Sequence, residues 1–380
     1  MIRKIYALSF LALSLMIMGG CSTSEKLLIL NWGEYINEDL VLLFEETYNV
    51  EVSISIADSN ELFYSKVKSG TTAFDLVLPS DYMIEKMIEQ DLLQTIDFSK
   101  LSNYDQTNNP YMQGLKGIMS TMSPGSNEYF VPYFWGTFGL MYNKRVEGLE
   151  TALDTYGWQA YFDQSLRPTN RVGMYDVAQY AYAAAMLYLD LNPNALPSDI
   201  SEGQTISNLE LARQALIDAQ FSVFADDALK KDIQANNLDL AFVWTGDFLD
   251  MLYVDLDEGM DYDEKLYDIY IPDNTMAFLD GFVIPKKARH VDLAHLFIDF
   301  FLDADHAYEN ASVVGYATPL ENTYNQITTY AEDDAWLNNW KRAYLDYYPD
   351  TPLFRGTPYA NFSQSVMSQL ISMLNDVKTN

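Results

Sequence analysis

Cysteine and histidine are scarce in this chain of 380 residues. Cys21 is the only cysteine, so the chain holds no pair that could form an internal disulfide. The three histidines, His290, His295 and His306, lie in or near one amphipathic segment without metal-ligand spacing, which favours positions on a helix surface. The sequence also lacks the G-x-S-x-G, H-E-x-x-H and phosphate-loop patterns. These absences argue against an enzyme, and we expect neither a metal nor a cofactor.

Basic residues are few as well. The chain has 23 Lys and Arg against 54 Asp and Glu, and its formal net charge is −31. Such a body repels nucleic acid and attracts cations, although physiological salt confines the reach of each surface charge to about 8 Å. The net charge therefore bears on solubility and capture rate more than on the identity of a ligand.

Long hydrophobic runs are confined to the N-terminus. A basic start is followed by an apolar run over residues 5–18 and then by two glycines, which predicts a signal peptide over residues 1–20. No later stretch of 18 uninterrupted apolar residues occurs. The sequence therefore predicts export of a body that does not itself span the membrane.

Cys21 follows the two glycines directly, and this arrangement resembles a bacterial lipobox. The resemblance implies lipidation of Cys21 after cleavage, with residues 21–25 as a linker, and thus an extracytoplasmic protein anchored to the bacterial membrane. The alternative is a cleaved signal peptide that releases a protein with an incidental cysteine.

The remaining chain is long and rich in apolar residues. Hydrophobic residues make up 49% of the sequence and aromatic residues 14%, which excludes a disordered chain. About 360 residues exceed what one hydrophobic core usually supports. Two lobes are therefore expected.

Strand-like and helix-like segments alternate through the first part of the chain. Residues 26–30, 50–56 and 74–78 are predicted strands, and the helices between them are predicted to begin at the N-caps Asn37 and Asp58. This alternation predicts a parallel sheet, whose ligands bind at the carboxyl ends of the strands. The polar segment 97–128 is predicted to be a surface excursion.

A second βα series follows. The pattern predicts strands at 171–175, 239–243 and 266–271, with Asp176 and Ser207 as helix N-caps. Between the two series, residues 129–143 are predicted to form two strand-like runs, and residues 276–285 a second crossing between lobes. Two crossings make each lobe discontinuous. The first lobe is predicted to comprise 26–135 and 279–324, and the second 136–278 and 325–380.

The turn at residues 30–35 combines aromatic rings with a carboxylate. Aromatic faces and carboxylates are the groups that hold an ammonium ion, and Trp32, Glu34 and Tyr35 supply both kinds next to Gly33, where the backbone can bend sharply. Taken alone, the segment fits equally well with core aromatics beside a solvated glutamate. The strand ends at Ser80-Asp81-Tyr82 and Trp244-Thr245-Gly246-Asp247 repeat the same combination of groups.

Seven segments in order resemble the spermidine/putrescine-binding proteins of bacterial ABC importers, and they cover essentially all of residues 27–320. These segments are L-N-W-G-E-Y at 30–35, D-S-N-E at 58–61, F-D-L-V-L-P-S-D-Y at 74–82, V-P-Y-F-W-G at 131–136, F-V-W-T-G-D at 242–247, F-L-D-G-F-V-I-P at 278–285 and G-Y-A-T-P at 315–319.

The resemblance implies an α/β, bilobal, periplasmic-binding-protein-like fold, with two discontinuous lobes joined by a two-stranded hinge. It also implies a monomer that binds a polyamine, putrescine or spermidine, and delivers it to an ABC permease. The implied ligand contacts are Trp32, Glu34, Tyr35, Ser80, Tyr82, Asp176, Gln179, Trp244, Asp247, Phe278, Asp280 and Tyr316.

The chain departs from the family at two places. Gln179 stands where the family usually has glutamate, and an amide accepts a hydrogen bond from an ammonium without neutralising it. The family's C-terminal polar contact matches neither Arg355 nor Gln364 convincingly. Asp176 could be only an N-cap, and Trp244 and Phe278 could be core residues. Other functions left open are the same fold binding another organic cation or an amino-acid derivative, and an adhesin or sensor.

Overall fold

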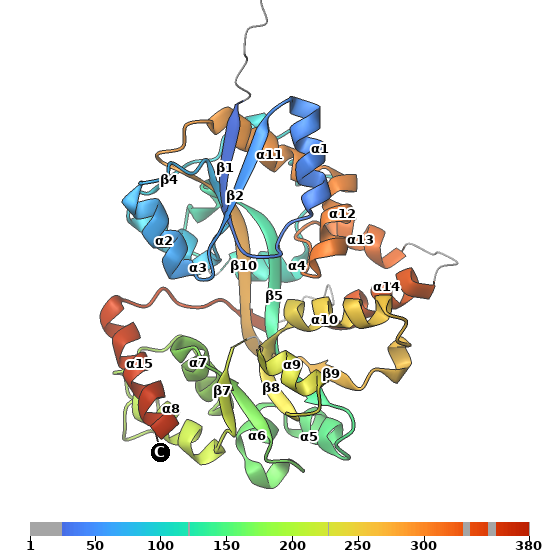
Figure 1. Cartoon of the computed structure of the whole chain (residues 1–380). Coiled ribbons are helices and arrows are strands. Elements are labelled where there is room, and N and C mark those ends of the chain that lie inside the picture. The colour runs from blue at the N-terminus through green and yellow to red at the C-terminus, as the bar shows by residue number, and fades with distance from the viewer. Residues whose placement is uncertain (1–24, 121, 227, 330–334, 349–354, 380) are drawn as a thin grey trace, which may run out of the picture.

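The computed structural model describes residues 25–120, 122–226, 228–329, 335–348 and 355–379. The predicted signal peptide and Cys21 lie outside the described residues. Figure 1 shows two lobes, one above the other, with the long strands β5 (Phe130–Asn143) and β10 (Asn274–Pro285) running through both. Among the described residues, no helix is both long enough and apolar enough to span a bilayer.

The first lobe is built on parallel strands. β1 (Lys26–Asn31) lies between β2 (Glu51–Ile56) and β3 (Leu76–Val77), and is parallel to both. β10 closes this part of the sheet antiparallel to β3 and also pairs with β4 (Leu93–Gln94). The helices of this lobe are α1 (Glu38–Tyr48), α2 (Asn60–Ser69), α3 (Asp81–Glu89), α4 (Gln113–Met119), α11 (Val291–Leu302) and α12 (Ala304–Val314). The next helix, α13 (Glu321–Thr329), crosses residue 324, where the first lobe was predicted to end.

The second lobe repeats this plan. β6 (Val172–Tyr175) lies parallel to β7 (Val223–Ala225) and β8 (Leu240–Trp244), while β8 and β9 (Tyr267–Tyr270) run antiparallel to β5. β11 (Arg355–Thr357) pairs with the start of β10. The helices are α5 (Leu149–Tyr156), α6 (Trp158–Phe162), α7 (Ala178–Tyr188), α8 (Asn208–Ala219), α9 (Ala228–Gln234), α10 (Thr245–Asp257), α14 (Ala335–Tyr347) and α15 (Gln364–Thr379).

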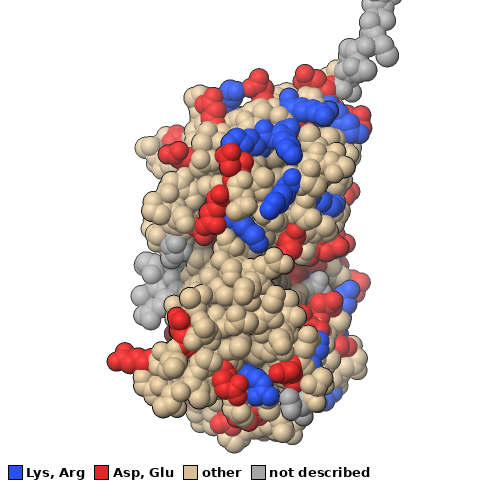
Figure 2. Space-filling model, turned by 90° about the vertical axis from the view of Figure 1, so that its left-hand side faces the viewer, with Lys and Arg blue, Asp and Glu red and all other residues tan. Residues whose placement is uncertain are grey.

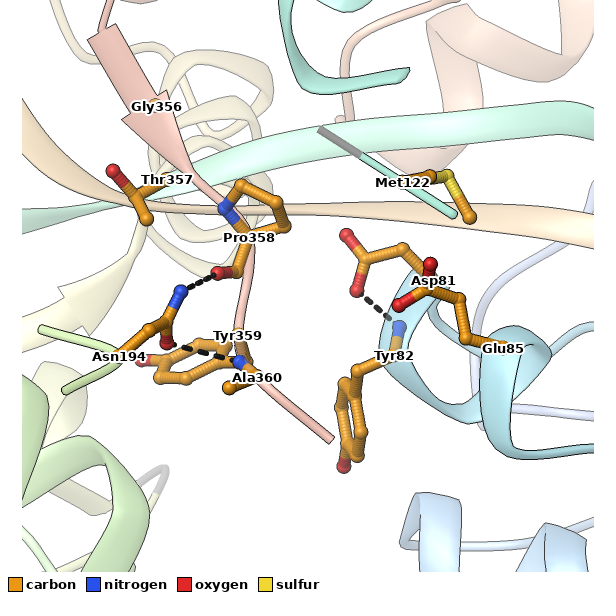
Figure 3. Close-up of a pocket in the computed structure, with 10 residues that line it drawn as sticks. All are labelled: Asp81, Tyr82, Glu85, Met122, Asn194, Gly356, Thr357, Pro358, Tyr359 and Ala360. Carbon is orange, nitrogen blue, oxygen red and sulfur yellow. Dashed lines mark hydrogen bonds between the residues drawn. The ribbon is translucent and has the colours of Figure 1, made fainter. Parts of the chain in front are cut away.

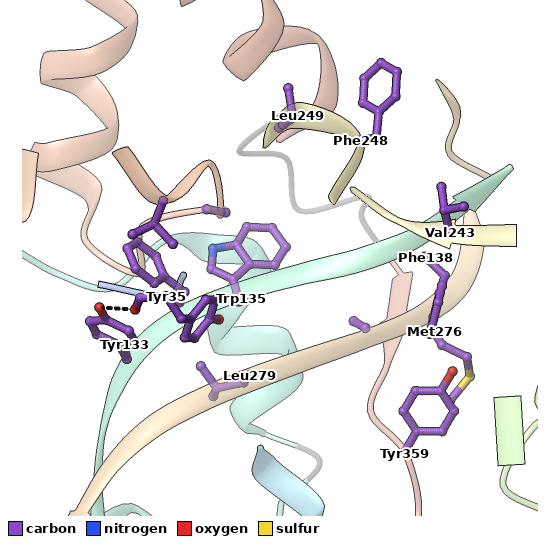
Figure 4. Close-up of a cluster of buried hydrophobic side chains, with 14 of the residues drawn as sticks. Tyr35, Tyr133, Trp135, Phe138, Val243, Phe248, Leu249, Met276, Leu279 and Tyr359 are labelled. Carbon is purple, nitrogen blue, oxygen red and sulfur yellow. Dashed lines mark hydrogen bonds between the residues drawn. The ribbon is translucent and has the colours of Figure 1, made fainter. Parts of the chain in front are cut away.

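The two crossing strands carry the centre of the fold. β5 is one continuous strand of 14 buried residues, so the prediction of two separate runs over 129–143 is wrong. It pairs with β10 from Thr137 opposite Ala277 to Phe130 opposite Val283, with an irregularity between Asp280 and Gly281. Figure 4 shows large side chains packed on both sides of these two strands, with Tyr133 donating a hydrogen bond to the Tyr35 carbonyl at 2.8 Å.

Helix starts follow local capping chemistry. The side chains of Asn37 and Ser207 accept hydrogen bonds from the N–H groups of Asp39 and Glu210, which confirms both predicted N-caps. The other two predicted caps are wrong by one residue. Ser59 caps α2 in place of Asp58, and Val177 precedes α7 without a capping side chain, because the carboxylate of Asp176 pairs with Lys378 instead.

Two further expectations are corrected by packing. The segment 97–128 is not only a surface excursion, because it contains α4 and buries Leu101, Met112 and Leu115. His295 is not on a helix surface, since only 2% of it is exposed and its Nε2 accepts a hydrogen bond from the Asp97 N–H at 2.9 Å. In both places, burial comes from contacts with elements distant in sequence.

Candidate functional site

The candidate site lies where the strand ends of both lobes meet β10. A chain of aromatic rings crosses it, with centroid separations of 5.2 Å from Tyr35 to Tyr316, 5.6 Å from Tyr316 to Phe278 and 4.8 Å from Phe278 to Trp244. All three pairs meet edge to face, an arrangement that aromatic rings favour. The structure therefore brings four of the predicted contacts, from four separate segments, into one row.

Asp280 is a buried carboxylate beside this row. It is 3% exposed, and its Oδ1 has no hydrogen-bond partner of ordinary geometry in the part of the chain that the structure describes. The buried hydroxyl of Tyr35 also lacks a partner of ordinary geometry, and it lies near enough to Asp280 to affect the pKa of that carboxylate. Burial raises the pKa of Asp280 to about 7, although the side chains of Ser80 and Tyr35 act in the opposite direction. An unpaired carboxylate in this position favours a cation as its partner.

Asp81 adds a second buried carboxylate at the start of α3. It accepts hydrogen bonds from the N–H groups of Tyr82 at 2.6 Å and Leu279 at 3.1 Å. Burial raises its pKa well above the usual range; the N–H of Tyr82 opposes that rise, and the charge of Asp280 adds to it. The resemblance did not assign Asp81 a role, although it lies between two predicted contacts, Ser80 and Tyr82.

Asp247 lies beside Tyr316, the second ring of the row, in the first turn of α10. Its Oδ1 accepts a hydrogen bond from the Tyr316 hydroxyl at 3.4 Å and lies 3.1 Å from the Lys230 Nζ. The backbone here requires glycine, because a Cβ on Gly246 would lie 2.1 Å from the Tyr316 ring. The ring thus packs directly on the start of α10.

The turn after β1 holds three predicted contacts, Trp32, Glu34 and Tyr35, and it buries them to different extents. Tyr35 is buried and Trp32 is half-buried, with its indole N–H donating to the Leu78 carbonyl at 2.8 Å and its ring against Phe63. Glu34 is exposed, in the left-handed backbone region at φ 51°. The aromatic side chains are therefore fixed by packing, while the carboxylate remains at the surface.

A pocket of about 190 Å³ lies between α3 and the segment that follows β11. Figure 3 shows Asp81, Tyr82 and Glu85 on one side and Pro358 and Tyr359 on the other. The remaining lining residues are Met122, Asn194, Gly356, Thr357 and Ala360. Asn194 bonds to the backbone of the segment at both Pro358 and Ala360. The pocket therefore joins the two lobes at a predicted contact, Tyr82.

Comparison with known proteins matches residues 30–308 to the model of one family, described as bacterial extracellular solute-binding protein. The chain belongs to this family. The match confirms extracytoplasmic solute binding, and it agrees with the predicted α/β fold in two lobes.

Among similar proteins is the putrescine-binding periplasmic protein PotF of Escherichia coli, 28% identical over 81% of this chain and 84% of that one. The spermidine/putrescine-binding periplasmic protein of Salmonella typhimurium is 28% identical over 83% and 84%. A putative spermidine/putrescine ABC transporter structure from Listeria monocytogenes is 30% identical, with a TM-score of 0.70, over 93% of this chain and 99% of that chain. These similarities confirm the predicted resemblance.

In this solute-binding protein, Asp176 and Gln179 are two of the predicted contacts that lie outside the aromatic row. Asp176 is exposed and pairs with Lys378 of α15, with Oδ2 2.7 Å from Nζ. Gln179 is buried, but its amide donates to the Ala360 carbonyl at 2.9 Å. Both side chains already have protein partners, so their roles as ligand contacts stay predictions.

The sequence analysis did not identify Tyr359. This residue is 5% exposed, and its hydroxyl has no hydrogen-bond partner among the described residues. Its ring lies 4.9 Å from Tyr180 and 6.5 Å from Trp244, so it extends the aromatic row. Gln364, one of the two candidates for a C-terminal contact, is exposed in the first turn of α15. The signal in the sequence that could have identified this contact is the aromatic residue Tyr359 itself, five positions before Gln364.

The pKa of Asp280 predicts a pH-dependent stability. Between about pH 4 and 7, the folded protein keeps a proton on Asp280 that the unfolded chain has released, so this residue's contribution to the free energy of unfolding falls as pH rises. Asp280→Asn removes that fall. The free energy of unfolding of the variant minus that of the wild type should therefore increase by a few kcal/mol between about pH 5 and about pH 8, since each tenfold change in ionisation is worth about 1.4 kcal/mol. Urea unfolding of amine-free protein measures the difference, and a constant difference contradicts the expectation.

Proposed function

We propose that this protein captures a polyamine, putrescine or spermidine, between its lobes and delivers it to an ABC permease in the membrane. The observation that carries the proposal is the buried, unpaired Oδ1 of Asp280 beside the row of aromatic rings. A protonated amine is both a hydrogen-bond donor and a cation, so it meets both needs of that carboxylate. Putrescine and spermidine are the ligands in the names of the similar proteins.

The energetics fit a small diamine or triamine. Each cation–π contact contributes roughly 0.5–2 kcal/mol, and each charge-assisted hydrogen bond about 1.5–3 kcal/mol. The costs of ordering and desolvation offset part of that sum. A net value near roughly −8 kcal/mol corresponds to micromolar affinity.

Lobe closure is the proposed mechanism. The first lobe comprises 26–135 and 279–324, the second 136–278 and 325–380, and the hinge lies in β5 and β10. Support comes from strand register: Trp135 pairs with Leu279 and Gly136 with Phe278, so both boundaries fall at the same level of the two strands. A ligand that bridges the lobes has all its partners only in the closed state, and therefore selects it.

The protein acts as a monomeric binding protein rather than an enzyme, held to the membrane by a lipid on Cys21. The similar proteins are periplasmic binding proteins by name. The body begins within a few residues of Cys21, since β1 starts at Lys26.

A second candidate function is that the same fold binds another organic cation or an amino-acid derivative. Gln179 in place of glutamate favours this candidate, because an amide does not neutralise an ammonium.

Titration calorimetry of the chain lacking residues 1–21 tests the ligand. Putrescine or spermidine should bind with micromolar affinity, whereas choline and an amino acid should not. Asp280→Asn should weaken polyamine binding at least about tenfold, because a lost charge-assisted bond is worth more than 1.4 kcal/mol. The control is Asp263→Asn, whose exposed carboxylate pairs with Arg342. Binding heat with choline or the amino acid, and none with either polyamine, favours the second candidate function. A polyamine affinity of Asp280→Asn equal to that of the wild type shows that Asp280 is not a ligand contact.

Small-angle scattering tests closure. The radius of gyration should decrease when saturating putrescine is added to the wild type, because the lobes approach one another. Asp280→Asn at the same putrescine concentration should show a smaller decrease. Equal radii with and without the ligand, at a concentration where calorimetry shows saturation, would exclude lobe closure as the mechanism.

Metabolic labelling with an alkyne fatty acid tests the anchor. The wild-type protein should carry the label and fractionate with membranes, because acyl chains partition into the bilayer. Cys21→Ser should lose the label and appear in the soluble fraction, whereas the neighbouring change Ser22→Ala should retain it. Membrane association of Cys21→Ser equal to that of the wild type rejects the anchor.

A further inference from the structure

Lys230 places an ammonium group on one of the carboxylates that the resemblance assigns to the ligand. Its Nζ lies 3.1 Å from Oδ1 of Asp247, and the side chains of the two residues are only 13% and 21% exposed. The Tyr316 hydroxyl donates to the same Oδ1 at 3.4 Å. The pair is thus largely sheltered from solvent, where charges are screened less than at an open surface.

Other acidic groups face the same ammonium. Asp250 lies one turn after Asp247 on α10, and burial raises its pKa. Lys230 and Lys231 lower the pKa of Asp250, and Glu34 raises it, which places all these charges within electrostatic reach of one another. Lys230 is therefore a cation close to a cluster of acidic residues, Asp247, Asp250 and Glu34, the last of which comes from the first lobe.

The two carboxylates beside the aromatic row, Asp280 and Asp247, differ in the charges that they contact. Asp280 forms no ion pair within the described ranges, and its Oδ1 lacks a hydrogen-bond partner. Asp247 already has a cation in contact. The Lys230 ammonium is already within hydrogen-bond distance of Asp247, so it repels a ligand ammonium that approaches the same carboxylate. The ligand must either share the carboxylate with Lys230 or displace Lys230.

We propose that Lys230 is a specificity-determining residue that occupies Asp247 and so penalises the second amine of a ligand. The inference rests on the proposed function and deepens it. The first amine of the ligand binds at Asp280, and an organic cation with one amine avoids the conflict at Asp247. The second amine of a diamine therefore adds less binding free energy than it would if Asp247 carried no lysine.

Calorimetry with butylamine and putrescine separates the contributions of Asp280 and Asp247, because the two ligands differ by one amine on the same carbon chain. Lys230→Met keeps the apolar stem and removes the ammonium. It should bind putrescine at least about tenfold more tightly than the wild type and butylamine within about twofold. The control is Lys231→Met, which removes the same charge from the exposed neighbouring position on α9 and should change both affinities by less than about twofold.

Adding Asp247→Asn to Lys230→Met should abolish the gain for putrescine, since the freed carboxylate is its source. Thermal unfolding checks that each variant folds, and Lys230→Gln serves in place of Lys230→Met should the latter be unstable. Unchanged or weaker putrescine binding by the folded Lys230 variant overturns the inference. Equal tightening for both amines, or a gain that persists in the double variant, overturns it too.

Failure of the broader proposal gives a different result. Should neither the wild type nor the Lys230 variant bind either amine, the proposed polyamine function is rejected, and the inference with it. Should the wild type bind putrescine and the Lys230 variant bind it no better, only the role of Lys230 is rejected.

Discussion

The candidate site depends on a carboxylate that is buried and that contacts no cation among the residues that the structure describes. Asp280 lies on β10, the strand that runs through both lobes, and its position is set by pairing with β5 on one side and by the bridge to Ser80 on the other. These backbone contacts hold the side chain inside, where its negative charge is poorly solvated. The raised pKa of Asp280 follows from that position. A cationic ligand relieves a cost that the fold itself imposes.

The aromatic row gives this carboxylate a dry and rigid environment. Two glycines permit the close packing, since a Cβ on Gly136 would lie 2.8 Å from the Phe278 ring and one on Gly246 even closer to Tyr316. Because the rings come from both lobes, the row exists only when strand ends from distant parts of the chain meet. The surface charge of the protein attracts cations in general, whereas in the proposed function the row and its carboxylates distinguish among them.

The two carboxylates beside the row are not equivalent. Asp280 and Asp247 are the same residue type, yet among the described residues Asp280 forms no ion pair and Asp247 is paired with Lys230. Asp176 is likewise paired, with Lys378. Carboxylates that a family pattern treats alike thus differ in the charge they can offer to a ligand, and that difference comes from lysines on α9 and α15, outside every matching segment.

The sequence by itself determined the elements and the family. Alternating strands and helices, the caps Asn37 and Ser207, and the aromatic and acidic strand ends are local patterns, and each depends on residues a few positions apart. The parallel sheets follow from them, and the resemblance to the family named Tyr35, Trp244, Phe278 and Tyr316 as contacts. Only the tertiary structure decided which carboxylates are free, because the partners of Asp247 and Asp176 lie 17 and 202 residues away and no local pattern records them. The same holds for Tyr359, whose hydroxyl is buried by contacts between the C-terminal segment and elements far earlier in the chain.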